Sequence, residues 1–229
     1  MMTSLTTTES ERSERQSRLT AAFVDSAVGS SGMLHAVLTT IYRSAPEPLA
    51  HAQRVAFVAR RIGEDLGLSE RELDDIERAA WVHDLGKLVL PDQPLSRANL
   101  VSPEDVLHWG KQVKVGAEIV GAVPFLRSTA ALVLASRECF DGSGYPFGLQ
   151  GDAIPLGSRI LHLADTFDTL VTLCMALERS ADAVNVELVR HAGTRFDPNV
   201  VATWLRSSDA PPSCVMYGGR DDADSPEEA

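Results

Sequence analysis

The stretch Ala79-Ala-Trp-Val-His-Asp-Leu-Gly-Lys-Leu88 places two polar residues, His83 and Asp84, at the end of an apolar helical run. A neutral imidazole and a carboxylate that face a core raise the free energy of the fold unless a partner satisfies them. A divalent metal ion satisfies both, because imidazole nitrogen and carboxylate oxygen are common metal ligands. The pair therefore indicates a metal site, provided that the rest of the chain supplies further ligands.

The helices around this stretch follow from the spacing of apolar residues. One helix is expected to open at His51, and the next is expected to begin at the capping-box sequence Ser69–Glu72 and to run to His83. His51 lies four residues before Val55, and His83 lies seven residues after Ile76, so both imidazoles fall on the apolar faces of their helices. Two histidines on two inward faces favour a shared site.

The remaining apolar pattern is helical as well. Ser44–Pro48 interrupts it before the first of these helices, and Pro91–Ser102 is predicted to be an irregular loop. Almost no alternation with period two is present, so we expect an all-α fold that forms a single compact helical bundle. Further helices are expected in these segments: residues 18–42 in two pieces broken at Gly29–Gly32, Pro103–Gly121, Pro124–Glu138, Pro155–Leu177, Ala181–Ala192 and Pro198–Arg206.

The length of 229 residues suits one well-buried domain with polar ends. We expect residues 1–17 to be disordered, 18–46 to form a short helical extension for packing or homodimerisation, 47–207 to form the domain, and 208–229 to be an acidic disordered tail. The net charge of -11 disfavours nucleic acid and anionic membrane surfaces as general partners. A small phosphorylated ligand stays compatible with this charge if a metal neutralises it locally.

The cysteines and the apolar runs bear on the cellular compartment. Three cysteines without a CxxC pair suit neither a disulfide framework nor a zinc knuckle. No stretch approaches the roughly 18 uninterrupted apolar residues of a membrane span, and residues 1–16 lack the apolar centre of a signal peptide. These features predict a cytoplasmic protein that keeps its thiols reduced.

Each further candidate ligand has a simpler interpretation when it is taken alone. An inward histidine such as His51 is more often a hydrogen-bonded core residue than a ligand, and Asp165 could cap a helix or pair with Arg159. Taken together with the pair in the opening stretch, His51 and Asp165 complete a set of two nitrogens and two oxygens from three helices. That donor set suits zinc, manganese or iron.

Between residues 47 and 204 the chain carries a series of short motifs: His51-Ala-Gln-Arg54, Ala80-Trp-Val-His-Asp-Leu-Gly-Lys87, Pro91-Asp92, Val115-Gly-Ala-Glu-Ile119, Asp141-Gly-Ser-Gly-Tyr-Pro146, Ile154-Pro155, Arg159, Ala164-Asp165, Asp168 and Ala192-Gly-Thr-Arg-Phe-Asp-Pro198. Their order resembles the HD superfamily of metal-dependent phosphohydrolases, and the flanking residues resemble its HD-GYP branch. The resemblance is specific, because no single short motif carries it.

The resemblance implies a compact helical bundle of the HD-domain type around a metal, a Mn, Fe or Zn ion. It implies hydrolysis of a cyclic dinucleotide, chiefly cyclic di-GMP, at the phosphodiester. Lys87 matches a lysine near the reacting phosphate, so Asp84 and Lys87 are the expected catalytic residues. The residues that match metal ligands of the family are Glu47, which only some members use, His51, His83, Asp84 and Asp165.

The chain departs from the family pattern where a second metal would be bound. Gln112-Val113 replaces a His-Pro pair, and Ser136-Arg137 replaces two consecutive histidines. His108, four residues before Gln112, is interpreted as an ordinary helix residue, with a displaced ligand as the alternative. The segment after Asp168 also lacks the Arg-Pro-Tyr-Arg sequence that approaches the substrate phosphates in the family. We therefore expect one metal per chain, and a substrate-binding role for Arg137 as a fixed positive charge where the second metal would sit.

Two functions are compatible with these observations. The first is a metal-dependent phosphodiesterase with a reduced, one-metal site. The second is a catalytically degenerate HD-GYP domain that acts as a regulatory or protein-binding module in cyclic-nucleotide signalling. The composition of the Asp141–Pro146 loop allows a rigid turn that merely connects helices. The resemblance offers the alternative of a contact for a signalling protein partner, because in the family this loop is associated with diguanylate-cyclase domains.

Overall fold

The structure is a computed structural model, and it describes residues 30–43, 46–90, 103–176 and 182–207. The chain divides into two compact units, residues 1–49 and residues 50–229. The predicted all-α fold is confirmed, because the described residues contain no β-strand and only one isolated bridge, between Ala192 and Phe196. No described helix combines the length and the apolar character needed to cross a membrane.

The first unit contains helix α2 (Ser30–Ile41). The predicted break at Gly29–Gly32 is wrong from Ser30 onward, because the helix begins there and includes Gly32. A glycine near a helix end costs about 1 kcal/mol or less relative to alanine, which is too little to stop the helix. Residues 1–29, 91–102 and 208–229, with the disorder, first helix and loop predicted there, lie outside the described residues.

Helix α3 (Pro46–Asp65) begins five residues earlier than the predicted start at His51. Proline in the first turn does not break a helix, because the first four backbone N–H groups have no acceptor within the helix. The start that was predicted from the two prolines of Ser44–Pro48 is therefore wrong. His51 consequently lies inside the helix, where its backbone is fixed by the turns on either side.

Helix α4 (Glu70–Val82) begins with the predicted capping box. The backbone N–H of Ser69 donates to Glu72 Oε2 at 2.9 Å, and the N–H of Glu72 donates to the Ser69 hydroxyl oxygen. Such a cap stabilises a helix start by about 1 kcal/mol. It fixes where α4 begins, and so where the helix delivers His83, which is its C-terminal cap.

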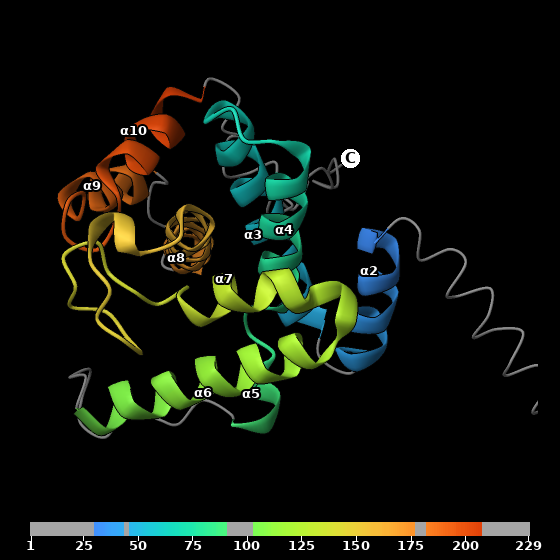
Figure 1. Ribbon diagram of the computed structural model, residues 1–229. Coiled ribbons are helices and arrows are strands. Elements are labelled where there is room, and N and C mark those ends of the chain that lie inside the picture. Colours follow the sequence, from blue (N-terminus) through green and yellow to red (C-terminus); the bar gives the residue numbers. More distant parts are fainter. Residues whose placement is uncertain (1–29, 44–45, 91–102, 177–181, 208–229) are drawn as a thin grey trace, which may run out of the picture. The chain divides into compact units, whose positions relative to one another are not determined.

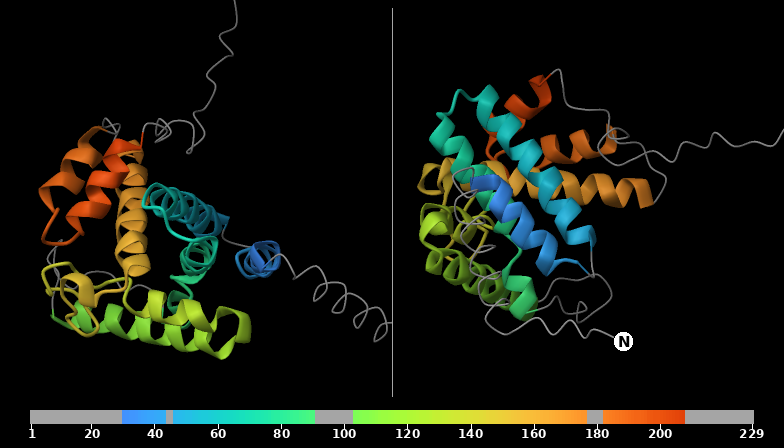
Figure 2. Two further views of the ribbon diagram at one scale, coloured as in Figure 1. Left: turned by 45° about the horizontal axis from the view of Figure 1, so that its top comes forward. Right: turned by 90° about the vertical axis from the view of Figure 1, so that its right-hand side faces the viewer.

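Helix α8 (Leu156–Ala176) is the central helix of the second unit, and Figure 1 views it along its axis. Helices α3 and α4 lie on one side of it, and α9 (Asp182–Arg190) and α10 (Pro198–Arg206) lie on the other (Figure 2). Every residue from 160 to 168 is buried. Asp165 and Asp168 belong to this stretch, so both carboxylates need partners inside the fold.

After α4 the chain turns sharply, and the next two helices pack against each other. Helix α5 (Gly86–Val89) packs on α6 (Pro103–Ala122), at the bottom of Figure 1. A Cβ atom at Gly86 would lie 1.9 Å from the carbonyl oxygen of Gln112 on α6, so only glycine permits this approach. The close contact holds the turn that contains His83 and Asp84 in place.

The helix predicted for Pro124–Glu138 is wrong in two places, because its first part is a 3-10 helix and the helical structure ends at Leu134. The segment forms a 3-10 helix, η1 (Pro124–Thr129), and a short helix α7 (Ala130–Leu134), and then turns. The carboxylate of Glu138 explains the turn, because it accepts the backbone N–H groups of Phe147 at 2.7 Å and Leu149 at 3.0 Å. This ties the Asp141–Pro146 loop, which precedes η2 (Gly151–Ala153), to the end of α7 and places Arg137 beside α8.

Candidate metal centre

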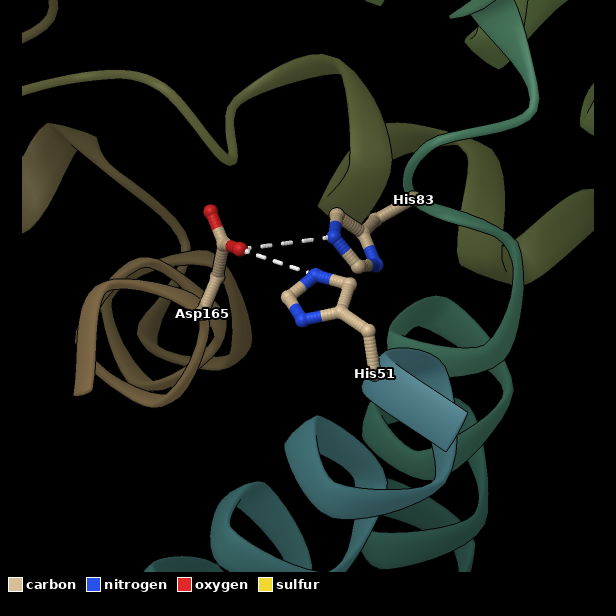
Figure 3. Close-up of side chains that lie close together, drawn as sticks. All are labelled: His51, His83 and Asp165. Atoms are coloured by element: carbon tan, nitrogen blue, oxygen red, sulfur yellow. Dashed lines mark ion pairs between the residues drawn. The ribbon is translucent and has the colours of Figure 1, made fainter. Parts of the chain in front are cut away.

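Three side chains from separate helices meet in the second unit: His51 on α3, His83 at the end of α4 and Asp165 on α8 (Figure 3). The Nε2 atoms of His51 and His83 lie 3.2 Å and 3.6 Å from Oδ1 of Asp165. Each residue offers one ligand atom, and these atoms all lie within 4.8 Å of one another. Three of the predicted ligands are therefore arranged as a set that could hold one cation.

His83 shows why this set fits a metal. Its side chain is buried, and Nδ1 lies 2.7 Å from the carbonyl oxygen of Ala80, to which it donates its proton. Nε2 then carries a lone pair and has no hydrogen-bond partner, although it faces the Asp165 carboxylate. Two facing acceptors need a cation between them, and a neutral imidazole held through its other nitrogen is the usual form of a metal ligand.

His51 is oriented by a carboxylate for which the sequence patterns predicted no role. Nδ1 of His51 lies 2.7 Å from Oδ2 of Asp168, which is only 1% exposed. The guanidinium of Arg54 donates two hydrogen bonds to the same carboxylate, from Nε at 2.7 Å and from Nη2 at 3.1 Å. The sequence contained a signal for this contact. Arg54 lies three residues after His51, and Asp168 lies three residues after Asp165, so each lies on the same helix face as the ligand before it.

The electrostatics of this group favour a bound cation. Burial opposes protonation of His51, but its hydrogen bonds to Asp165 and Asp168 prevail and raise its pKa from 6.5 to about 10. Burial alone would raise the pKa of Asp165, but the charge of Arg137 and the hydrogen bond from His51 hold it well below its ordinary value. In the metal-free protein His51 is thus protonated, so a proton and a metal ion compete for the same place.

Asp84 lies beside the three ligands rather than among them. Its Oδ1 is 3.5 Å from Nε2 of His83, and its Oδ2 is 3.9 Å from Nε2 of His51. The same Oδ2 accepts a hydrogen bond of 2.8 Å from Lys87 Nζ. Burial opposes ionisation of Asp84, but the positive charges of Lys87 and Arg137 lower its pKa, so it is a carboxylate. Its role as a fourth metal ligand stays a prediction.

Arg137 reaches the carboxylates of the site from the turn after α7. Its Nη1 forms an ion pair with Asp165 Oδ2, and its Nη2 lies 3.6 Å from Asp84 Oδ1. Burial opposes the charge, but Asp165 and Asp84 raise the pKa of Arg137. The alternative that Asp165 pairs with Arg159 is wrong, because Arg159 pairs with Asp197 at 2.7 Å.

The residues that replace the family histidines do not form a second ligand set in the described part of the chain. Gln112 donates from Nε2 to the carbonyl oxygen of Leu90 at 2.7 Å, and His108 Nε2 lies 3.4 Å from the same amide. This bond ties α6 to the end of α5. Glu47 lies in the first turn of α3, within the other compact unit, and its role as a ligand stays a prediction.

Residues 37–200 match the family model described as HD domain. The chain is 37% identical over 160 residues to the cyclic di-GMP phosphodiesterase response regulator RpfG of Xanthomonas campestris pv. campestris. The aligned region covers 69% of this chain and 42% of that protein. It is 31% identical over 189 residues to the 3'3'-cGAMP-specific phosphodiesterase 2 of Vibrio cholerae, and this aligned region covers 81% of this chain and 36% of that protein.

The fold is similar to that of a solved structure of a cyclic GMP-AMP specific phosphodiesterase of Vibrio cholerae. The TM-score is 0.57 at 23% identity, and the match covers 73% of this chain and 46% of that one. The chain spans about two fifths of the length of the two curated relatives, with 42% and 36% covered. The resemblance to the HD-GYP branch is confirmed, and the chain belongs to the HD domain family.

Proposed function

We propose that this chain is a phosphodiesterase domain that hydrolyses a cyclic dinucleotide at a site with one divalent metal ion. The observation that carries the proposal is the buried Nε2 of His83, which has no hydrogen-bond partner and faces Asp165 beside His51. The relatives named for activity on cyclic di-GMP and on 3'3'-cGAMP support the substrate class. Mn, Fe and Zn all suit this donor set.

His51, His83 and Asp165 would hold the metal, with Asp84 as the fourth ligand. When bound, a divalent metal supplies a Lewis acid and lowers the pKa of a bound water molecule. Hydrolysis breaks one P–O ester bond of the substrate, and water supplies OH to phosphorus and a proton to the leaving oxygen. The contacts of Asp168 and of the Ala80 carbonyl behind the ligands fix the two imidazoles in the orientation that this chemistry needs.

Lys87 and Arg137 supply the fixed positive charge. Arg137 is held by Asp165 and Asp84, and its charge stays in place without a metal. The side chain of Lys87 is 39% exposed and is held on Asp84, so its ammonium group lies at the open side of the site. N–H donors that are fixed before the reaction stabilise the charge on phosphate oxygens in the transition state. Arg137 thereby takes over part of the role of a second metal.

The test is a metal and activity assay on the purified protein. Metal per chain is measured together with hydrolysis of cyclic di-GMP, 3'3'-cGAMP and bis(p-nitrophenyl) phosphate. Asp84→Asn is compared with Asp74→Asn, which changes a half-exposed carboxylate on the outer side of α4. We expect about one metal per chain, and activity that is lost in Asp84→Asn and retained in Asp74→Asn. Absence of metal, or equal activity in both variants, would contradict the proposal.

The ion pairs of Arg137 favour a second function, a regulatory or protein-binding module. Asp165 and Asp84 are already neutralised by Arg137 and Lys87, so the site is compatible with a fold that holds no metal. The Asp141–Pro146 loop would then contact a signalling protein such as a diguanylate-cyclase domain, and Phe147 beside it is 59% exposed. Binding of that domain with equal affinity before and after chelation, without hydrolysis, would select this function. A homodimer through residues 18–46 belongs to the same proposal.

The cysteines support a cytoplasmic location for either function. Cys139 and Cys174 are free and half-buried. Burial raises the pKa of the Cys139 thiol, so it is protonated and unreactive at neutral pH. Free thiols of this kind are typical of proteins in a reducing compartment.

A further inference from the structure

Arg195 is a basic side chain near the metal centre to which the proposed function assigns no role. It lies in the connection between α9 and α10 and is exposed. The ion pairs of the described residues include none that involves Arg195. In a chain with a net charge of -11, an arginine without a carboxylate partner beside a phosphate-cleaving site points to an anionic ligand.

Arg195 makes three contacts, two through its side chain and one through its backbone. Its Nε donates to Nε2 of His162 at 3.1 Å, and its guanidinium carbon lies 5.4 Å from the ring centroid of Phe196. Its carbonyl oxygen accepts the backbone N–H of Phe140 at 3.3 Å, just before the Asp141–Pro146 loop. A long side chain held in this way has lost its conformational freedom before a ligand arrives, which favours binding.

His162 is oriented so that its ring accepts a hydrogen bond from Arg195. Its ring is buried, and Nδ1 donates to the carbonyl oxygen of Glu138 at 2.8 Å, so Nε2 is an acceptor. Burial and the charges of Arg195 and Arg137 lower the pKa of His162 to about 3, so it stays neutral at physiological pH. The bond to His162 uses one of the five N–H donors of Arg195, and the two Nη groups remain for a ligand.

His162 also places Arg195 at the metal centre. It precedes Asp165 by three residues on α8, which is about 4.5 Å along a helix axis and on the same face. Arg137 approaches the same face, and partial burial with the charge of Arg137 lowers the pKa of Arg195. Of these two guanidinium groups, Arg137 has carboxylate partners and Arg195 has none among the described residues, which favours an anion beside Arg195.

We propose that Arg195 binds the phosphate of the cyclic dinucleotide that is not being cut, while the metal centre and Arg137 hold the other. This inference rests on the proposed function and names its substrate class more closely, a ligand with two phosphodiesters. Arg195 would supply this phosphate contact from the connection between α9 and α10. Arg195 would therefore determine specificity for a ligand with two phosphodiesters over a ligand with one.

The experiment measures binding without hydrolysis. The metal-loaded protein is titrated with a hydrolysis-resistant phosphorothioate analogue of cyclic di-GMP and with cyclic GMP, which has one phosphodiester. Arg195→Gln is expected to weaken binding of the analogue by about tenfold or more and binding of cyclic GMP by less than about twofold. Arg190→Gln, on the exposed end of α9, is the matched control and is expected to change neither.

Arg195→Lys keeps the charge but cannot both contact His162 and present a planar fork, so it should give an intermediate loss. Equal loss for both ligands, no loss in Arg195→Gln, or absence of analogue binding would overturn the assignment. Binding that depends on Arg195 in a protein that hydrolyses nothing would contradict the proposed hydrolysis and support the assignment of Arg195. The two proposals therefore fail in distinguishable ways.

Discussion

The two sides of the metal centre satisfy their charges in different ways. On the first side, His51 and His83 direct ring nitrogens at Asp165, and their other nitrogens are already bonded to Asp168 and to a backbone carbonyl. On the second side, Arg137 brings its own positive charge to Asp165. The first side therefore offers its ligand atoms to a proton or a metal ion, whereas the second side contains a fixed cation. Under the proposed function, the chain would combine one metal position with one arginine.

The buried charge of Arg137 on the second side depends on its carboxylate partners. A guanidinium taken out of water is tolerated only with carboxylate partners, and breaking such a buried pair costs about 3–5 kcal/mol. Arg137 meets this requirement with Asp165 and Asp84. Asp165 thereby serves both sides, with Oδ1 toward the histidines and Oδ2 toward Arg137. Substitutions on either side should separate the two roles.

The largest effect is expected on the histidine side. His83→Ala removes one of three ligands that converge on one cation, so metal content should fall from about one per chain to less than about a tenth, and hydrolysis by about 1,000-fold or more. Elemental analysis and cyclic di-GMP hydrolysis measure both. His191→Ala, a half-exposed histidine after α9, should retain both. A metal-loaded, active His83→Ala protein would show that the histidine side does not need a cation.

On the arginine side, a substitution should change the rate of hydrolysis without changing the metal content. Arg137→Gln removes a fixed charge that is not a ligand, so metal content should stay near one per chain while the rate of hydrolysis falls by about 100-fold. Elemental analysis and the kcat for cyclic di-GMP give the two values. Loss of the metal, or unchanged metal content together with unchanged affinity for the phosphodiester, would show that Arg137 does not replace a second metal.

Much of this arrangement could be predicted from the sequence, because its signals are local. Helical spacing placed His51 and His83 on inward faces, and the motif order supplied Asp165. The contacts that hold the ligands could not be predicted in this way. Arg54 and Asp168 are 114 residues apart, and the packing of α3 against α8, rather than local spacing, brings them together.

The same limit applies to the helix boundaries. Proline predicted a break before α3, but in a first turn it removes no hydrogen bond, and the helix begins at Pro46. The predicted helix through Glu138 ends early, because this buried carboxylate bonds the backbone of the next loop. That early turn is what brings Arg137 to Asp165, an ion pair that a helix continued to Glu138 does not predict.

A smaller effect should follow from the carboxylate behind His51. Asp168→Asn keeps the shape but weakens the hold on the imidazole and on Arg54, so metal affinity should fall by about 10- to 100-fold. Competition with a fluorescent chelator measures the dissociation constant. Asp152→Asn changes a carboxylate that is 95% exposed and provides the control. Equal affinity in both variants would show that Asp168 has only a packing role.

The smallest effect is a pH dependence of the metal-free protein. The pKa of His51 is about 10 in the folded state against the ordinary histidine value of 6.5, which applies to the unfolded chain, so the folded state binds the proton more tightly. The resulting stability is fully present below about pH 6.5 and is lost as the pH rises toward 10, a change of at least about 1 kcal/mol. Thermal unfolding of chelated protein between pH 7 and pH 10 measures it. His51→Gln should flatten this dependence, and an unchanged slope would contradict the assignment.

The most direct test of the one-metal site is the anomalous scattering of a metal-loaded crystal. We predict one metal peak per chain, coordinated by Nε2 of His51, Nε2 of His83 and Oδ1 of Asp165 at about 2.0–2.2 Å, as expected for Zn. Arg137 should remain paired with the other oxygen of Asp165. Two peaks bridged by a carboxylate, or a peak away from His83, would contradict a centre that combines one metal with one arginine.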